Sequence, residues 1–200
     1  MAALPPYPLR LARAIDRVAI WSGRLTAWLI IPMVLSLVYE VAARYLFDAP
    51  TIWAYDMTYM FYGSFFMLGS AYTLQRKGHI RTDTFYGAWS PRRQGAVDAA
   101  CYLLLFFPSL LAFFWVGWEY FWRSFQLGER IVTSPWMPIV YPFKFVLPLA
   151  AALLLLQGVS ETIKSVMAAL SGAWHDDGPQ TEALVEAELI DPGSARDGRS

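Results

Sequence analysis

The sequence has little charge for its length. Only 16% of its 200 residues are Asp, Glu, Lys or Arg, whereas 56% are hydrophobic; a soluble domain has roughly 25% charged residues. Four stretches contain no charged residue at all: Leu25 to Tyr39, Met57 to Gln75, Ala99 to Trp118 and Phe145 to Ser160. A helical membrane span needs about 20 mostly apolar residues, and none of the four shows the alternation of a membrane strand. The sequence therefore predicts an all-α integral membrane protein with four transmembrane helices, and leaves no room for a soluble catalytic domain.

Cysteine and histidine are also scarce. The single cysteine, Cys101, excludes an intramolecular disulfide. The two histidines, His79 and His175, lie outside the apolar stretches, so no histidine pair can hold a haem and no His/Cys cluster can hold a metal within the membrane. Serines in the apolar stretches have no companion histidine for nucleophilic catalysis. We expect no cofactor, no metal and no enzymatic activity.

The charged and polar residues divide the chain into three parts. We expect a cytoplasmic arm over residues 1–17, a membrane domain over 18–170 and a disordered tail over 171–200, which is rich in Gly, Pro, Ser and Arg. Phe85, Tyr86 and Trp89 share one helical face, which is typical of a helix that lies at the membrane surface. The membrane domain is predicted to hold transmembrane helices near 25–47, 54–76, 95–122 and 138–164, and a short amphipathic interfacial helix near 80–90.

The distribution of Lys and Arg predicts the orientation. Four basic residues lie on one side, at Arg44, Arg123, Arg130 and Lys144. Ten lie on the other: Arg10, Arg13, Arg17, Arg24, Arg76, Lys77, Arg81, Arg92, Arg93 and Lys164. The positive-inside rule then places both termini in the cytoplasm.

The third helix carries a start signal and a kink signal. Ser90 followed by Pro91 is typical of an N-cap and a first helical residue. A helix from Pro91 to Trp122 would be roughly 48 Å long at about 1.5 Å per residue, so it must tilt or protrude from the bilayer. Pro108 is the expected kink.

Charged residues recur at the predicted outer membrane surface. Glu40 and Arg44 are four residues apart, as are Glu119 and Arg123, in the order that favours a helical ion pair. Asp56 opens the second helix and Lys144 the fourth. These groups could form an ion path or self-neutralising pairs that fix helix packing, and their balance near an interface favours the pairs. For Lys144, the possible partners are Asp56, Glu119 or the lipid headgroups.

One loop points to a known family. The run Gly78-His79-Ile80-Arg81-Thr82-Asp83, followed by Ser90-Pro91-Arg92-Arg93, resembles the signature of the DctQ-like small membrane subunit of tripartite ATP-independent periplasmic (TRAP) transporters. Arg44-Tyr45-Leu46-Phe47 and the acidic start of the second helix also match, although many relatives have glutamate where this chain has Asp56.

The resemblance implies a non-catalytic scaffold subunit in the bacterial inner membrane. Its partners would be a large elevator-type membrane subunit, a periplasmic substrate-binding protein and membrane lipids, with no role for nucleic acid. The complex would take up a small organic anion, commonly a carboxylate, by sodium coupling. His79, Arg81 and Asp83 would order the cytoplasmic loop, and Arg92 and Arg93 would meet headgroups or the large subunit.

Two other functions remain open at this point. In a stand-alone channel or carrier, Glu40, Asp56 and Glu119 would line the path. The chain could also anchor a redox complex in the membrane. The absence of a mid-membrane charge and of broken helices favours the scaffold over an independent transporter.

Overall fold

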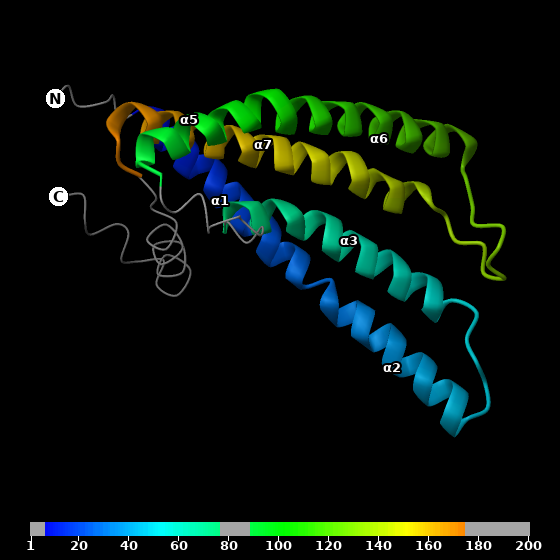
Figure 1. Ribbon diagram of the computed structural model, residues 1–200. Coiled ribbons are helices and arrows are strands. Elements are labelled where there is room, and N and C mark those ends of the chain that lie inside the picture. Colours follow the sequence, from blue (N-terminus) through cyan, green and yellow to red (C-terminus); the bar gives the residue numbers. More distant parts are fainter. Residues whose placement is uncertain (1–6, 77–88, 175–200) are drawn as a thin grey trace, which may run out of the picture.

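The computed structural model describes residues 7–76 and 89–174, and over these ranges the protein is entirely helical apart from loops and one isolated bridge between Arg130 and Ile139. The helices are α1 (Tyr7–Ala27), α2 (Ile30–Leu46), α3 (Ala54–Gln75), α5 (Pro91–Cys101), the π-helix η1 (Tyr102–Phe106), α6 (Phe107–Leu127) and α7 (Tyr141–Ser171) (Figure 1). This confirms the all-α prediction. The predicted interfacial helix and the tail fall largely on residues 77–88 and 175–200, outside the described residues.

Helix α7 is the centre of the bundle. It packs against α6, α5, α3 and α1, whereas α2 packs mainly against α3. We call the end that holds the starts of α1 and α5 and the last turns of α7 the terminal end. The opposite end, with the loops 47–53 and 128–140, is the loop end. Figure 1 shows that α2 diverges from α6 and α7 toward the loop end, so that the bundle is closed at one end and splayed at the other.

The first helix begins far earlier than predicted. It starts at Tyr7, so most of the predicted arm 1–17 is part of a packed helix. Apolar residues at a spacing of three and four are buried on one face of α1, while Arg10, Arg13 and Arg17 are exposed on the other. The buried residues are Ala12, Ile15, Ala19 and Ile20. The three arginines favour a solvated cytoplasmic arm, whereas the apolar face between them packs as part of a helix.

Three helical segments are long and apolar enough to cross a membrane: Leu9–Leu46, Pro91–Leu127 and Tyr141–Ser171. The first includes a short break at Trp28 and Leu29 between α1 and α2. The second predicted span coincides with α3 (Ala54–Gln75). Its mean hydropathy is lower than that of the three segments, so α3 is not among them. Its tyrosines, serines and glycines make α3 less apolar than its single charged residue, Asp56, suggests.

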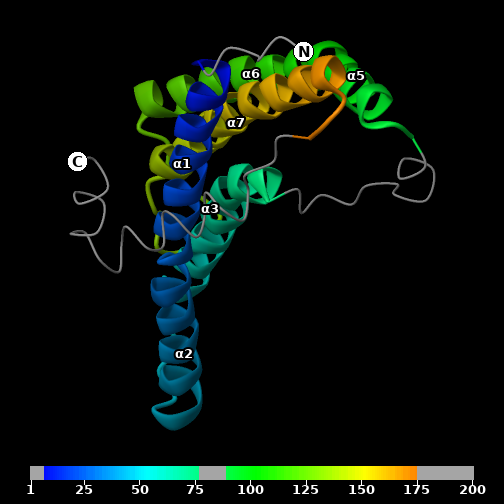
Figure 2. The same ribbon diagram turned by 90° about the vertical axis from the view of Figure 1, so that its left-hand side faces the viewer.

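The helix from Pro91 to Leu127 starts and bends where the sequence indicates. Ser90 is its N-cap and Pro91 its first residue, and the Ser90 carbonyl accepts hydrogen bonds from the N–H groups of Arg93 (2.9 Å) and Gln94 (3.1 Å). The π-helix η1 lies immediately before Pro108. A proline has no N–H and its ring conflicts with the carbonyl four residues earlier, so the wider turn accommodates it. The resulting bend between α5 and α6 is visible in Figure 2.

Glycines permit close helix contacts at the terminal end. A Cβ atom at Gly95 of α5 would lie 2.5 Å from the carbonyl oxygen of Ser165 on α7, and one at Gly158 of α7 would lie 2.4 Å from Cε1 of Phe106. Neither position can hold a larger side chain without a shift of its neighbours. Both contacts therefore tie the α5–η1 segment to α7.

Candidate functional site

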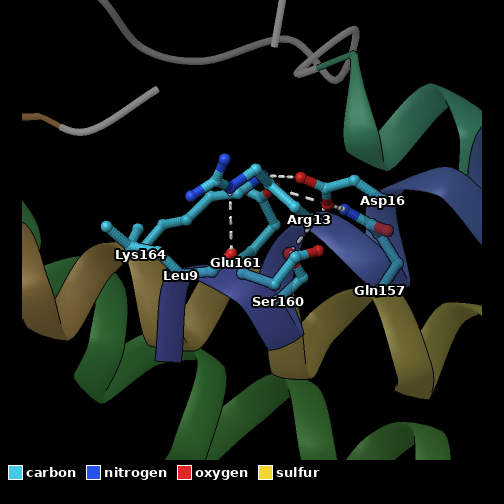
Figure 3. Close-up of polar contacts among 8 residues, drawn as sticks. Leu9, Arg13, Asp16, Gln157, Ser160, Glu161 and Lys164 are labelled. Carbon is cyan, nitrogen blue, oxygen red and sulfur yellow. Dashed lines mark hydrogen bonds and ion pairs between the residues drawn. The ribbon is translucent and has the colours of Figure 1, made fainter. Parts of the chain in front are cut away.

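A cluster of polar and charged side chains is buried at the terminal end, between α1 and α7 (Figure 3). We call it the terminal cluster; its members are Asp16, Gln157, Ser160, Glu161 and Lys164. Their exposed fractions are between 0% and 6%. Charged groups this deeply buried in an apolar bundle are rare unless they are paired.

Lys164 is the centre of the cluster. Its ammonium nitrogen lies 2.8 Å from Asp16 Oδ2 and 2.9 Å from Glu161 Oε1. The other oxygen of Asp16, Oδ1, accepts hydrogen bonds from Ser160 Oγ (2.7 Å) and Gln157 Nε2 (2.9 Å). The two carboxylates thus share one ammonium, and Asp16 is held on both oxygens.

Helical periodicity builds the cluster from the side of α7. Gln157, Ser160, Glu161 and Lys164 are spaced by three, four and seven residues and so share one face of the helix. This polar stripe faces Asp16 on α1, and Ser160 Oγ also donates to the carbonyl oxygen of Ala12 (3.2 Å). Because a buried charge without its partner is costly, the cluster fixes α1 on α7.

The sequence analysis missed this cluster. Lys164 was counted only as a basic residue of the predicted cytoplasmic side, and Asp16 and Glu161 were not considered. The polar stripe from Gln157 to Lys164 within an otherwise apolar helix is the signal that could have found it.

The two expected ion pairs of the loop end are present. Arg44 Nε donates a 3.0 Å hydrogen bond to Glu40 Oε1, and Glu40 Oε2 accepts from the backbone N–H of Thr51 (2.9 Å) and from the Thr51 hydroxyl. Arg123 lies 3.0 Å from Glu119, with the two side chains 74% and 56% exposed. Glu40 therefore connects α2 to the loop before α3, whereas the Glu119–Arg123 pair lies within one helix.

Lys144 does not pair with either predicted acid. Its ammonium contacts Glu129 and lies 3.8 Å from the ring centre of Tyr120. Asp56 instead accepts a hydrogen bond from the hydroxyl of Ser134. In the described residues Lys144 therefore pairs with neither Asp56 nor Glu119, and the headgroup alternative stays a prediction.

The fold of the loop before α7 explains this difference. The N–H of Val140, which directly precedes α7, donates to the carbonyl of Glu129 (3.0 Å). The loop therefore folds back and places Glu129 beside the start of α7. The hydrogen bond from Lys144 lowers the pKa of the Glu129 carboxyl below its usual value. Glu129 is thus the anion that offsets the Lys144 charge.

Two more of the predicted residues, Arg92 and Arg93, lie at the terminal end. Arg92 lies across the end of α7, since a Cβ atom at Gly172 would be 3.0 Å from its Nε. Arg92 and Arg93 are both exposed. His79, Arg81 and Asp83 fall outside the described residues, so their role as loop-ordering residues stays a prediction.

The arrangement contains separate ion pairs rather than one connected site. Within residues 7–76 and 89–174, no group of three or more His, Cys, Asp or Glu side chains could hold a metal ion. The four carboxylates Asp16, Glu40, Glu119 and Glu161 each lie beside a Lys or Arg. Each of these four carboxylates is therefore offset by a neighbouring cation.

Comparison with known proteins identifies a family. Residues 33–168 match the sequence model described as the DctQ component of tripartite ATP-independent periplasmic transporters. This match covers more than half of the 200 residues. No curated protein matches the chain.

Proposed function

We propose, from the premise that this chain belongs to the DctQ family of TRAP transporter components, that it is the scaffold subunit that braces a large elevator-type membrane subunit. The family membership makes it a membrane component of a transporter. The scaffold role is the more specific hypothesis, and the pairing of the buried charges supports it most directly.

A subunit that transports an ion or an anion needs a polar site that the substrate can enter. Here Lys164 occupies the space between the two most deeply buried carboxylates, Asp16 and Glu161. Glu40 and Glu119 are each paired with the arginine one turn later. Broken helices that point their ends at a substrate are the usual alternative. Here η1 continues into α6 without an interruption, and in the short break between α1 and α2 the N–H groups of Trp28 and Leu29 still donate to backbone carbonyls one turn earlier. The chain therefore supplies shape and surface to a partner.

The exposed apolar surface is consistent with such a partner. Large side chains on α2, η1 and α6 are exposed in the isolated chain, including Leu35 (62%), Leu104 (73%) and Trp115 (73%). In a bilayer these residues would meet lipid or another membrane protein. Close packing of small residues, rather than the hydrophobic effect, would then select the protein partner.

We also propose that α3 is a fourth span, so that both termini lie in the cytoplasm. Its 22 residues give a length of about 33 Å at about 1.5 Å per residue, which is enough for the hydrocarbon core. It packs against α1, α2 and α7, and the hydroxyls of Thr58, Ser70 and Thr73 donate to backbone carbonyls of α3 itself. The excess of Lys and Arg at the terminal end supports a cytoplasmic location for that end in the bacterial inner membrane.

The other partners follow from the family by analogy. A periplasmic binding protein would deliver a small organic anion, most often a carboxylate, and the large subunit would move it together with sodium. Substrate selectivity would then reside in the two partner proteins.

Co-purification of the two membrane subunits tests the scaffold role. We expect the double substitution Arg81→Ala/Asp83→Ala to reduce the amount of large subunit recovered with the tagged chain about tenfold, because the family resemblance assigns these charged side chains to ordering the loop and the loss of one charge-assisted hydrogen bond is of that size. The matched control, Arg196→Ala/Asp197→Ala, removes the same residue types outside the family match and should change nothing. Wild-type recovery from the Arg81/Asp83 variant would contradict the proposed role of this loop.

A further inference from the structure

An apolar pocket opens at the loop end, between α3, α7 and the loop 128–140. Its volume is about 520 Å³, within the range of small-molecule sites. Ser64 and Arg130 are the polar side chains that line it. The larger apolar side chains of the lining are Met57, Met60, Phe61, Trp136, Met137 and Phe143. The pocket is therefore an apolar cavity with one guanidinium, that of Arg130, contributed by the loop 128–140.

The loop that forms one wall is held in place by hydrogen bonds. The Ser134 hydroxyl donates to Asp56 at the start of α3. Within the loop, Ile131 N–H donates to the Pro138 carbonyl and Met137 N–H to the Ser134 carbonyl, each at 3.1 Å. Met137 has a φ of 48°, a conformation uncommon for a residue other than glycine. These contacts fix the wall, so the pocket exists before any ligand enters.

Arg130 differs from the other three cations of the loop end. Arg44, Arg123 and Lys144 each have a carboxylate partner. Arg130 is exposed, and its Nη1 donates a 3.2 Å hydrogen bond to the carbonyl of Met137. Within the described part of the chain no carboxylate pairs with it. A guanidinium has five N–H donors in a planar fork, so most of its donors remain available to an anion.

The combination of these features identifies a ligand class. A guanidinium binds phosphate oxygens in a bidentate manner, and the adjoining walls suit a hydrocarbon chain. Trp136 also lines the pocket, and Trp is typical of the membrane–water interface. Of the two nearby acids, Glu129 is offset by the ammonium of Lys144. The Asp56 carboxylate is held by the Ser134 hydroxyl and does not line the pocket.

We propose that this pocket binds a phospholipid, with one acyl chain between α3 and α7 and the phosphate on Arg130. This inference goes beyond the scaffold function and requires only that the chain lies in a bilayer. The lipid would fill the opening between α3 and α7 at the splayed end of the bundle.

Native mass spectrometry of the purified full chain tests the proposal. Dioleoyl phosphatidylglycerol is added to detergent-solubilised protein, and dioleoylglycerol, which has the same acyl chains and no phosphate, is added in parallel. Inorganic phosphate is added in a third series. We expect one tight phosphatidylglycerol site, weaker binding of dioleoylglycerol and no competition by inorganic phosphate.

Three variants locate the site. Arg130→Ala should weaken the tight site about tenfold, because a charge-assisted hydrogen bond is lost. The matched control Arg123→Ala removes another exposed arginine of the same end that does not line the pocket, and should leave binding unchanged. Met60→Trp fills the pocket while it keeps Arg130, and should abolish binding of both lipids. The melting temperature of each variant confirms that it is folded.

Several results would overturn the proposal. Equal affinity for the two lipids would show that the pocket does not recognise the phosphate. Competition by inorganic phosphate would show that the acyl chain adds nothing to the binding of phosphatidylglycerol. Unchanged binding in folded Arg130→Ala and Met60→Trp would place the lipid elsewhere. Loss of the site in the complex with the large subunit would show that a protein side chain, not a lipid, fills the pocket in the assembled transporter.

Discussion

The terminal end and the loop end of this bundle use ion pairs in different ways. At the terminal end, the side chains of Lys164 and Asp16 alone are 7% and 3% exposed, and they join α1 to α7, which are far apart in sequence. At the loop end, Arg123 and Glu119 are 74% and 56% exposed and lie on one helix. The same chemistry therefore fixes tertiary structure in the buried pair and adds little in the exposed one, because water screens only the exposed pair.

The largest effect should follow from removal of the Lys164 ammonium. Lys164→Met leaves Asp16 and Glu161 buried without their shared cation. We expect this change to lower the free energy of unfolding by about 3–5 kcal/mol. Thermal or denaturant unfolding of the purified protein in detergent, followed by tryptophan fluorescence, measures the loss.

A triple variant separates charge imbalance from lost packing. Asp16→Asn/Glu161→Gln/Lys164→Met removes all three charges and should regain most of the stability lost in Lys164→Met. A single variant as stable as the wild type would show that the terminal cluster does not fix α1 on α7.

A smaller loss is expected where α5 meets α7. Gly95→Ala places a Cβ atom 2.5 Å from the Ser165 carbonyl oxygen, so the helices must separate. Overpacking of this kind costs about 1–3 kcal/mol. The matched control Gly69→Ala lies on α3, where an added Cβ meets nothing within 4 Å. It should be neutral or stabilise the helix by about 0.5–1 kcal/mol. Equal effects in the two variants would contradict the close α5–α7 contact.

The Glu129–Lys144 pair should make part of the stability depend on pH. Hydrogen bonding to Lys144 lowers the pKa of Glu129 from its ordinary value of 4.5, so the native state favours the carboxylate. The pair's contribution is present above about pH 4.5 and is lost as pH falls through the lowered pKa. Wild-type protein should therefore lose more stability between pH 7 and pH 3 than Glu129→Gln.

The side chain of Glu129 is 42% exposed, so this effect is at most about 1 kcal/mol. Lys144→Met, which removes the cause of the shift, should reduce the pH dependence in the same way. Identical acid profiles for wild type and Glu129→Gln would show that the pair is not formed in solution.

The smallest effect belongs to the Glu119–Arg123 pair. Arg123→Ala should change the free energy of unfolding by less than about 0.5 kcal/mol, since both groups are largely solvated in the isolated chain. Unfolding in the same detergent as Lys164→Met gives a direct comparison of the two ends. A loss similar to that of Lys164→Met would remove the distinction between them.

The sequence pattern was informative where one dominant physical effect determines the structure. Long apolar runs predicted the helices that became α5 to α6 and α7, and the Ser90-Pro91 start was confirmed. The loop signature and the closing residues of the first helix led to the correct family, as the match over residues 33–168 confirms. Length, hydropathy and local capping are all visible within one segment.

Tertiary contacts were not visible in this way. Asp16 and Lys164 come from opposite ends of the domain, so their contact depends on how α1 packs on α7. The partner of Lys144 depends on the return of the loop at Glu129, which no helical spacing predicts. The first helix is predicted near 25–47, whereas it begins at Tyr7. The segment before Leu25 is amphipathic and charged, and only its packing on the other helices shows that it belongs to the bundle.

Reconstitution of this chain into liposomes, alone and together with the large membrane subunit and the binding protein, tests the scaffold function most directly. The measurement is sodium-driven uptake of the organic anion that the binding protein carries. We predict no uptake above empty liposomes by this chain alone, and uptake only when all three proteins are present. Uptake by this chain without any other protein would contradict the proposed function.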